Sequence, residues 1–574
     1  MRCSKSTLYT QSDTSHLSVI LQRRYCVIGV TRDLPSRPAF TSENKKKMTA
    51  LRNLILGSTA GLLAITGAQA ADLPVKAKAV EYVRICSLYG AGFWYIPGTD
   101  TCMKIGGYLR VDTTFNGGAH GAPAWNGDMG QQNRYADRML SRSRMALTID
   151  TRTATEYGVV RTFGQGDFQF QNFGTTNPAV LTAPGVNSAL LSTPSGGYVA
   201  VEYLFIQFAG FTFGKSSSAY STPWNGFPGN INSNLLGGNN TDTGVNNIQY
   251  TAQFGNGVSA SIGLDDPTVW NRTAVYNLSI PGAIGANGTG SNAYAGFHSP
   301  DIVGNIRVDQ AWGLFQVSGA AHEVSGTYNI LGAGSAPTGL SEISGHPETK
   351  WGGSVMVALQ IKNLPTGPGD DIKMDATYAK GVTKNVIATS GGSPSFAMFG
   401  DSGSAYQSVG FGATTDGVYF PGGTDGIKLT TAWGIRGAFN HNWDPYWSSS
   451  LFGSFSSVRY DGGANDNLLG AGVTSAKGAY CAAFAASHAG QALVGNAAGA
   501  YTCNPDFNVS QLGMITRWTP VKNLTFSAEV QWFHLDQKMS GSSVFAASAP
   551  KPATLYEFKD QDTFLLQVRA QRNF

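Results

Sequence analysis

The sequence has little charge and, after its first 70 residues, no long hydrophobic run. Only 13% of its 574 residues are charged, whereas about a quarter are charged in ordinary soluble domains. Membrane-spanning helices need apolar stretches of about 20 residues, and polar or glycine residues interrupt every run after residue 70. Basic clusters interleaved with aromatic residues are also missing. These absences exclude a bundle of transmembrane helices and argue against nucleic acid as a partner.

Apolar and aromatic residues are nevertheless plentiful. The chain is 42% hydrophobic and 11% aromatic, and it contains 72 glycines. A disordered polyelectrolyte would have far fewer apolar residues. The chain therefore has enough apolar material to bury, but too little charge to cover an ordinary water-facing surface.

A secretory signal peptide is predicted at 48–70. This segment begins with Met48 and carries Arg52 before a short apolar stretch that ends in Ala-Gln-Ala. A positive start, a short apolar stretch and small residues at the exit are typical of such signals, so we expect cleavage after Ala70. The basic stretch 1–47 shows neither strand nor helix periodicity. We interpret it as an upstream extension from a gene start placed too early, with Met48 as the true start.

Loss of residues 1–70 would change both the charge and the cysteine count. These residues hold ten Lys and Arg and three Asp and Glu, so the remainder has 30 basic and 33 acidic residues, a net charge of −3 instead of +4. Four of the six cysteines remain, as two local pairs: Cys86 with Cys102 and Cys481 with Cys503. An oxidising compartment favours disulfides within such pairs. Free buried thiols are the alternative.

Alternation of apolar and polar residues with a period of two dominates the chain from residue 103 onward. In 103–116, for example, Leu109 and Val111 alternate with Arg110 and Asp112. This period is typical of strands with one apolar and one polar face. Sixteen strands are predicted: 103–116, 139–152, 155–167, 197–209, 211–216, 245–254, 257–265, 301–309, 312–325, 350–362, 370–381, 427–441, 445–459, 508–519, 523–536 and 561–574.

The connections between these strands alternate between short and long. Thr153-Ala154 and Gly255-Asn256 are short, whereas 117–138 and 382–426 are long. Outer-membrane barrels have short periplasmic turns and long external loops. We therefore predict an all-β, sixteen-stranded antiparallel transmembrane β-barrel over 103–574, with a water-filled lumen. A soluble lectin or propeller is the alternative, and it explains neither the signal peptide nor the rhythm of the loops.

The chain resembles the alphaproteobacterial general porins from the signal peptide to its last residue. The resemblance is carried by VRICSLYGAGFWYIPGTDTC at 83–102, the following MKIGGYLRVD, the start ADLPVK at 71–76 and the final Arg-Asn-Phe574. It implies an outer-membrane homotrimer, surrounded by lipid and lipopolysaccharide, that passes small hydrophilic solutes. The segment 71–102, with its Cys86 and Cys102 pair, is expected to be periplasmic. Phe574 resembles the signal read by the outer-membrane assembly machinery, although a plain hydrophobic anchor is equally compatible.

The resemblance also implies that the third long loop, 217–243, folds into the barrel and narrows it. This loop is rich in glycine, asparagine and proline, and Tyr220, Trp224 and Phe227 are predicted to anchor it. Such a composition suits a compact irregular loop packed against a wall. An ordinary exposed loop is the alternative.

Charges on the predicted lumen wall should set the selectivity of the channel. Alternation sends four arginines on three adjacent strands to the lumen: Arg110, Arg142, Arg144 and Arg161. Asp242 is the only acid in the third loop, so opposing charge would come from Asp112, Glu202, Asp375 and Glu529. Arginine keeps its charge at any physiological pH and attracts anions. We expect a constriction less cation-selective than one whose loop is packed with carboxylates.

No catalytic, cofactor or metal site is predicted. Histidines are scattered without an i, i+4 pair, and C-x-x-C is absent. A passive diffusion channel is therefore the leading prediction. The alternatives are a solute-specific channel, and a structural or adhesive barrel that acts through its loops.

Overall fold

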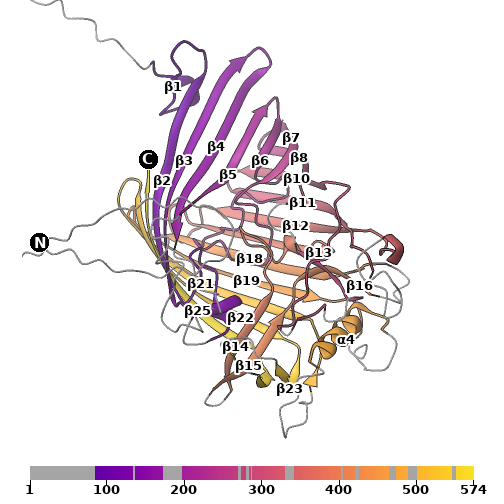
Figure 1. The fold of residues 1–574 in the computed structure, drawn as a ribbon. Helices are drawn as coiled ribbons and strands as arrows, with labels where there is room; N and C mark the ends of the chain where they lie inside the picture. The colour runs from indigo at the N-terminus through magenta and orange to yellow at the C-terminus, as the bar shows by residue number, and fades with distance from the viewer. Residues whose placement is uncertain are drawn as a thin grey trace, which may run out of the picture. The chain divides into compact units, whose positions relative to one another are not determined.

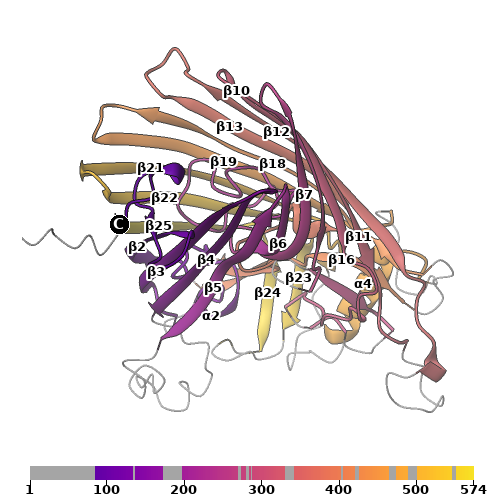
Figure 2. The same ribbon diagram turned by 90° about the horizontal axis from the view of Figure 1, so that it is seen from above.

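Sixteen antiparallel strands form a closed barrel in the computed structural model of the chain (Figures 1 and 2). They belong to a 17-stranded sheet whose remaining member, β1 (Trp94–Tyr95), pairs with β2. Each barrel strand pairs with its neighbours in chain order, and β25 closes the ring on β2. The barrel strands are β2 (Cys102–Phe115), β3 (Met139–Thr155), β4 (Gly158–Gln171), β5 (Tyr198–Phe208), β6 (Phe211–Ser216), β7 (Val245–Gly255), β8 (Val258–Asp265), β10 (Asp301–Gln310), β11 (Gly313–Val324), β12 (Lys350–Lys362), β13 (Asp371–Lys380), β18 (Thr431–Asn442), β19 (Trp447–Arg459), β21 (Phe507–Val521), β22 (Leu524–Gln537) and β25 (Gln561–Asn573).

The structure describes the greater part of the chain after residue 83. The predicted signal peptide, the segment 1–47 and the start of the mature chain lie outside the described residues. The described ranges are 84–132, 136–171, 197–268, 273–279, 283–285, 287–329, 342–402, 405–420, 426–463, 473–488, 501–545, 551 and 553–574.

The sixteen predicted strands are confirmed, and only their ends differ. The turn predicted at Thr153-Ala154 lies three residues later, at Glu156-Tyr157, because Thr155 pairs with Gly158 and its hydroxyl accepts a hydrogen bond from Tyr157 N. The turn between β7 and β8 is Asn256-Gly257, and both residues have positive φ. An Asn-Gly pair is favoured in such two-residue hairpins because both residues tolerate this conformation.

The two faces of the strands differ in polarity as the alternation predicts. Ile105 and Leu109 of β2 are about half exposed on the outer face, whereas Asp112 and Thr114 are fully buried on the inner face. A closed barrel pairs its backbone groups between strands, so its outer face can be apolar without a continuous apolar sequence. The low charge of the chain is thus a consequence of its broad apolar outer face.

The shorter elements lie largely outside the barrel wall. No described helix is long and apolar enough to cross a bilayer. The elements are η1 (Ser87–Tyr89), α2 (Gly127–Gly130), β9 (Ala274–Asn277), η3 (Glu342–Ser344), η4 (Thr383–Asn385), β14 (Phe396–Ser402), β15 (Ala405–Gly412), β16 (Thr415–Tyr419), β17 (Lys428–Leu429), α4 (Ala476–His488), β20 (Tyr501–Thr502), β23 (Ser540–Phe545) and β24 (Thr554–Phe558).

The long loops build a folded cap at the end of the barrel where they emerge, which we call the loop end. A five-stranded sheet, β14-β15-β24-β23-β20, lies there together with α4 (Figures 1 and 2). Its core includes Phe411, Phe484 and Phe545, which come from three different loops. The disulfide Cys481–Cys503 ties α4 to the residues before β21. Loop segments far apart in sequence therefore share one hydrophobic core.

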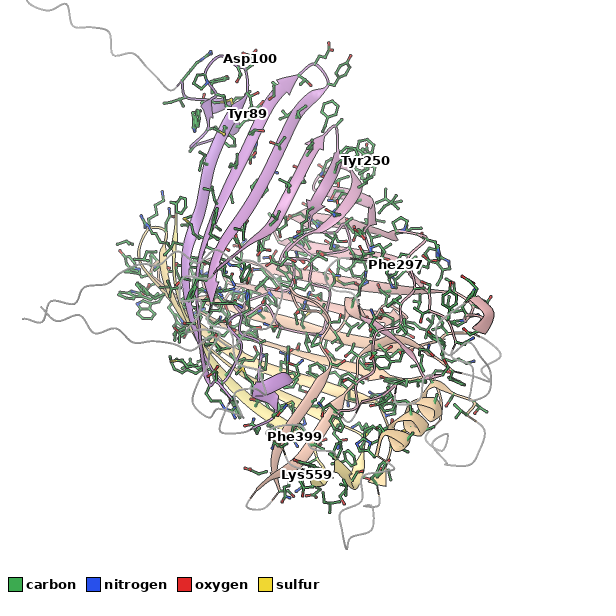
Figure 3. The ribbon with its side chains drawn as sticks, in the orientation of Figure 1. Tyr89, Asp100, Tyr250, Phe297, Phe399 and Lys559 are labelled. Atoms are coloured by element: carbon green, nitrogen blue, oxygen red, sulfur yellow. A yellow bond between two sulfur atoms is a disulfide. The ribbon has the colours of Figure 1, made fainter. Side chains whose placement is uncertain are left out.

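The opposite end, with the short turns, carries the amino-terminal segment. The disulfide Cys86–Cys102 joins this segment to the first residue of β2. Figure 3 shows Tyr89 and Asp100 beside this turn end, whereas Phe399 and Lys559 lie in the cap. Both cysteine pairs expected from the sequence are thus disulfides in the structure.

Candidate functional site

Loop 3, residues 217–244 between β6 and β7, folds into the barrel. Tyr220 and Trp224 are buried, and their neighbours include Val303, Met356 and Leu314 of the barrel wall. Asn305 and Gln316, on the inner face of β10 and β11, donate side-chain hydrogen bonds to loop carbonyls. The structure therefore places two of the three expected anchors against the wall, whereas Phe227 is only partly buried and lines a cavity.

A buried ion pair holds the middle of loop 3. Arg436 Nε lies 3.0 Å from Asp375 Oδ1, and both side chains are fully buried. Trp224 Nε1 donates to Asp375 Oδ2 at 2.8 Å. Arg436 also donates to the carbonyl oxygen of Asn239 at 2.5 Å. One arginine-carboxylate pair thus fixes loop 3 at two points that lie 15 residues apart.

Glu529 and Gln511 fix the next part of the loop to β22 and β21. The Glu529 carboxylate accepts hydrogen bonds from Ile231 N at 2.5 Å and Asn232 N at 3.3 Å. Gln511 accepts from Leu236 N at 2.8 Å and donates to Asn234 O at 3.0 Å. Asp375 and Glu529, expected to supply charge opposite the arginines, are instead buried anchors of loop 3.

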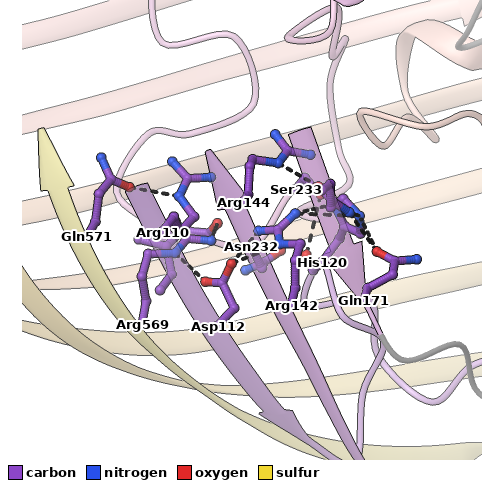
Figure 4. A network of polar contacts seen from close by, with 12 residues as sticks. Arg110, Asp112, His120, Arg142, Arg144, Gln171, Asn232, Ser233, Arg569 and Gln571 are labelled. Carbon is purple, nitrogen blue, oxygen red and sulfur yellow. Dashed lines mark hydrogen bonds and ion pairs between the residues drawn. The ribbon is translucent and has the colours of Figure 1, made fainter. Parts of the chain in front are cut away.

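A network of arginines lies on the wall formed by β25, β2 and β3 (Figure 4). Arg142 and Arg569 share Asp112, with separations of 2.5 Å to its two different carboxylate oxygens. Asp112 itself is fully buried. Arg142 also donates to His120 Nδ1 at 2.6 Å. Burial and the neighbouring Arg142 lower the pKa of His120 to about 3, so this histidine is neutral and accepts the bond.

Arg144 forms a second centre on the same wall. It lies 2.5 Å from Asp167 and 3.1 Å from Glu202, and its Nε donates to Gln169 at 2.6 Å. These partners come from β4 and β5, so the arginine ties three neighbouring strands together. Arg144 also lines a cavity in the lumen.

Arg110 differs from its neighbours because the described residues give it no ion-pair partner. Its Nε donates to Gln571 at 2.7 Å, and its guanidinium lies over the Tyr108 ring, 4.4 Å from the ring centroid. These two contacts orient the group and leave the described structure without an acceptor for either Nη nitrogen. A planar guanidinium that is pre-oriented in this way can bind a carboxylate or phosphate through two parallel hydrogen bonds.

A cavity of about 920 Å³ separates this arginine wall from loop 3. Among the residues that the structure describes, five basic ones line it: Arg110, Arg142, Arg144, Lys215 and Arg569. The described acids that line it are Glu202 and Asp242. Burial raises the pKa of Asp242 to about 6, so its negative charge is lost in mildly acidic conditions.

The alternation predicts that Arg161 faces the lumen, but it does not predict the position of Arg161 along the barrel axis. Arg161 pairs with Asp150 at 3.0 Å, near the turn between β3 and β4, and does not line the cavity. It precedes Gln169, the partner of Arg144, by eight residues on β4, which corresponds to about 26 Å along a strand. Arg569 and Lys215, by contrast, line the cavity and are absent from the predicted set. Arg569 could have been found, because alternation in the last strand also turns it inward.

The carboxyl-terminal residue completes the closing pair of strands. Phe574 N donates to Gly107 O, and Gly107 N donates to Phe574 O. The Phe574 side chain is 60% exposed. No group of three or more His, Cys, Asp or Glu side chains suited to a metal ion occurs within the described part of the chain.

A closed barrel of sixteen antiparallel strands with an apolar outer face, a polar lumen and an inward third loop defines an outer-membrane barrel of the porin class. The family model described as "Porin subfamily" matches residues 72–566. The chain therefore belongs to this porin family, which confirms the resemblance seen in the sequence, and it is an outer-membrane β-barrel protein.

Two curated relatives and one solved structure illustrate the range of similarity. Porin Omp2b of Brucella suis biovar 1 (strain 1330) is 33% identical over 268 residues, which are 46% of this chain and 63% of that porin. Porin Omp2b of Brucella melitensis biotype 1 is 33% identical over 269 residues, with the same coverage. The outer membrane channel DcaP of Acinetobacter baumannii aligns with a TM-score of 0.49 at 12% identity, over 84% of this chain and 99% of that one.

Proposed function

We propose that the chain forms a passive, water-filled channel for small hydrophilic solutes and ions, and that its constriction favours anions. The observation that carries this proposal is the cavity between loop 3 and the arginine wall, lined by five basic and two acidic residues. A narrow passage with one sign of charge and low-dielectric walls concentrates ions of the opposite sign.

The placement of the carboxylates supports the preference for anions. Asp112, which pairs with Arg142 and Arg569, is fully buried and does not line the cavity, whereas the two arginines do. Lys215 Nζ donates to backbone carbonyls, including Val201 O at 2.6 Å and Glu202 O at 3.1 Å. Its positive charge therefore remains without a carboxylate partner among the described residues.

Single-channel recording of the refolded protein in planar bilayers tests the channel itself. Discrete current steps in potassium chloride are expected, with current proportional to salt concentration. Complete silence of a correctly folded barrel would overturn the proposal and favour a structural or adhesive role. Current that saturates with one added solute, or is blocked by it, would instead favour a solute-specific channel.

We also propose that the protein is a homotrimer in contact with outer-membrane lipid and lipopolysaccharide, and that the outer-membrane assembly machinery inserts it. The exposed outward Phe574 at the closing strand supports the last point. Current steps that close in three equal levels would support the trimer, whereas single levels throughout would argue for independent monomers.

A further inference from the structure

A second loop segment enters the barrel beside loop 3. We call residues 382–392, which follow β13, the strap. Its residues Val382, Val386, Ile387 and Ala388 are fully buried. Ile387 pairs with Gly238 of loop 3 in a parallel bridge, and Gly237 N donates to Val386 O at 2.8 Å.

Charged and polar groups fix the start of the strap to the wall and to the cap. Lys384 Nζ lies 2.5 Å from Asp301 Oδ2, and His322 lies 2.5 Å from the other oxygen of the same carboxylate. Asp416 of β16 accepts hydrogen bonds from Thr383 N at 2.5 Å and Thr383 Oγ1 at 2.8 Å. These bonds connect the strap directly to β10 and β16, and through Asp301 to His322 of β11.

The tip of the strap reaches the cavity that contains the arginine wall. Thr389, Ser390 and Gly391 line this cavity. Thr389 Oγ1 accepts hydrogen bonds from the N–H groups of Gly391 and Gly392, each at 3.1 Å, which closes the tip into a tight turn. These two bonds satisfy backbone N–H groups of Gly391 and Gly392 and hold the tip in this turn.

Ser390 joins the tip to the middle and to the carboxyl-terminal end of loop 3. Its N–H donates to Ser233 O at 3.1 Å, and its carbonyl accepts from Thr243 Oγ1 at 3.1 Å. Its side chain is partly exposed and has no hydrogen-bond partner among the residues that the structure describes. The Ser390 hydroxyl group therefore lies at the cavity and makes no described hydrogen bond that holds the strap.

We propose that the strap is a second selectivity element of the constriction, with Ser390 as the residue that borders the ion path. This inference rests on the proposed channel function. The passage then has three sides: the arginine wall, loop 3 and the tip of the strap. A charge at Ser390 acts on permeating ions directly, because it faces the water that they cross.

Charge placed at this position after folding provides the test. The variant Ser390→Cys is refolded, inserted into planar bilayers, and modified with a cationic or an anionic methanethiosulfonate reagent of similar size. The cationic reagent is expected to shift the anion-to-cation permeability ratio about twofold towards anions, and the anionic reagent about twofold towards cations. Bulk alone would change the conductance but would not produce opposite shifts.

The matched control is Asp401→Cys, an exposed position in the same loop on β14 and outside the cavity. Both reagents should leave its permeability ratio unchanged. Identical shifts with both reagents at residue 390, or no shift after modification is verified by mass, would overturn the role of the strap while the channel persists. Absence of current from the unmodified protein would instead overturn the proposed function.

Discussion

Arginine-carboxylate pairs lie on two sides of the lumen, but they differ in whether the arginines line the cavity. Under loop 3, the Asp375–Arg436 pair is sealed from water and holds the loop. Across the cavity, Asp112 is fully buried and does not line the cavity, whereas its partners Arg142 and Arg569 line it although they are largely buried themselves. Both sides contain ion pairs, yet only the second side has paired arginines that line the cavity. Under the proposed function, selectivity should therefore depend on which arginines line the cavity, not on the net charge of the chain.

The largest effect is expected from breaking the sealed pair under loop 3. Asp375→Asn leaves the Arg436 guanidinium buried without a counter-charge, which should destabilise the fold by about 3–5 kcal/mol. Thermal unfolding followed by circular dichroism measures this loss. The double variant Asp375→Leu with Arg436→Met removes both charges and should lose less. A single variant as stable as the unaltered protein would show that the pair does not hold the loop.

A smaller loss of stability is expected for Glu529→Gln. Its partners are the backbone N–H groups of Ile231 and Asn232 and the Asn232 side chain, and a neutral amide oxygen still accepts one of these bonds. Replacing these charge-assisted hydrogen bonds with neutral ones should lower the free energy of unfolding by about 1–3 kcal/mol. The same unfolding experiment ranks the two anchors, and a greater loss than for Asp375→Asn would make Glu529 the stronger anchor of loop 3.

On the open side, Arg110→Gln should change selectivity more than stability. The arginine lacks a described ion-pair partner and borders the cavity, so its removal should shift the permeability ratio about twofold towards cations. The stability should change by less than about 1 kcal/mol. Arg161→Gln is the matched control, because Arg161 lies outside the cavity. Equal shifts in both variants would show that height in the barrel does not matter.

The smallest effect concerns the one acid of loop 3. Asp242 has a pKa of about 6, so lowering the pH from about 7.5 to 5 protonates it and removes a negative charge from the cavity. The preference for anions should therefore rise as the pH falls, by less than about twofold. Asp242→Asn should reduce this dependence and leave only the contribution of other groups. An unchanged pH profile in this variant would exclude Asp242 as its source.

Much of the barrel could be predicted from the sequence because strand periodicity is a local property. Alternation places Arg110, Arg142 and Arg144 on the inner face, and the length of the connections separates turns from loops. Alternation alone does not give the position of a residue along the barrel axis. It therefore groups Arg161 with arginines that lie at a different level of the lumen. Height depends on how each strand is staggered against its neighbours.

The roles of Asp375 and the strap could not be predicted for a different reason. Asp375 pairs with Arg436 because these residues are directly opposite in the register of β13 and β18, which a loop of 50 residues separates. The strap contacts loop 3 through irregular backbone without periodicity, and the core of the cap combines aromatic residues from three loops. Such long-range contacts leave no repeating pattern in the sequence.

The reversal potential of the unaltered protein in a potassium chloride gradient tests the central claim most directly. If the open side of the lumen presents its arginines to the passage, the potential should take the sign of chloride-favouring permeation. A potential with the sign of potassium-favouring permeation would contradict the proposed role of the arginine wall.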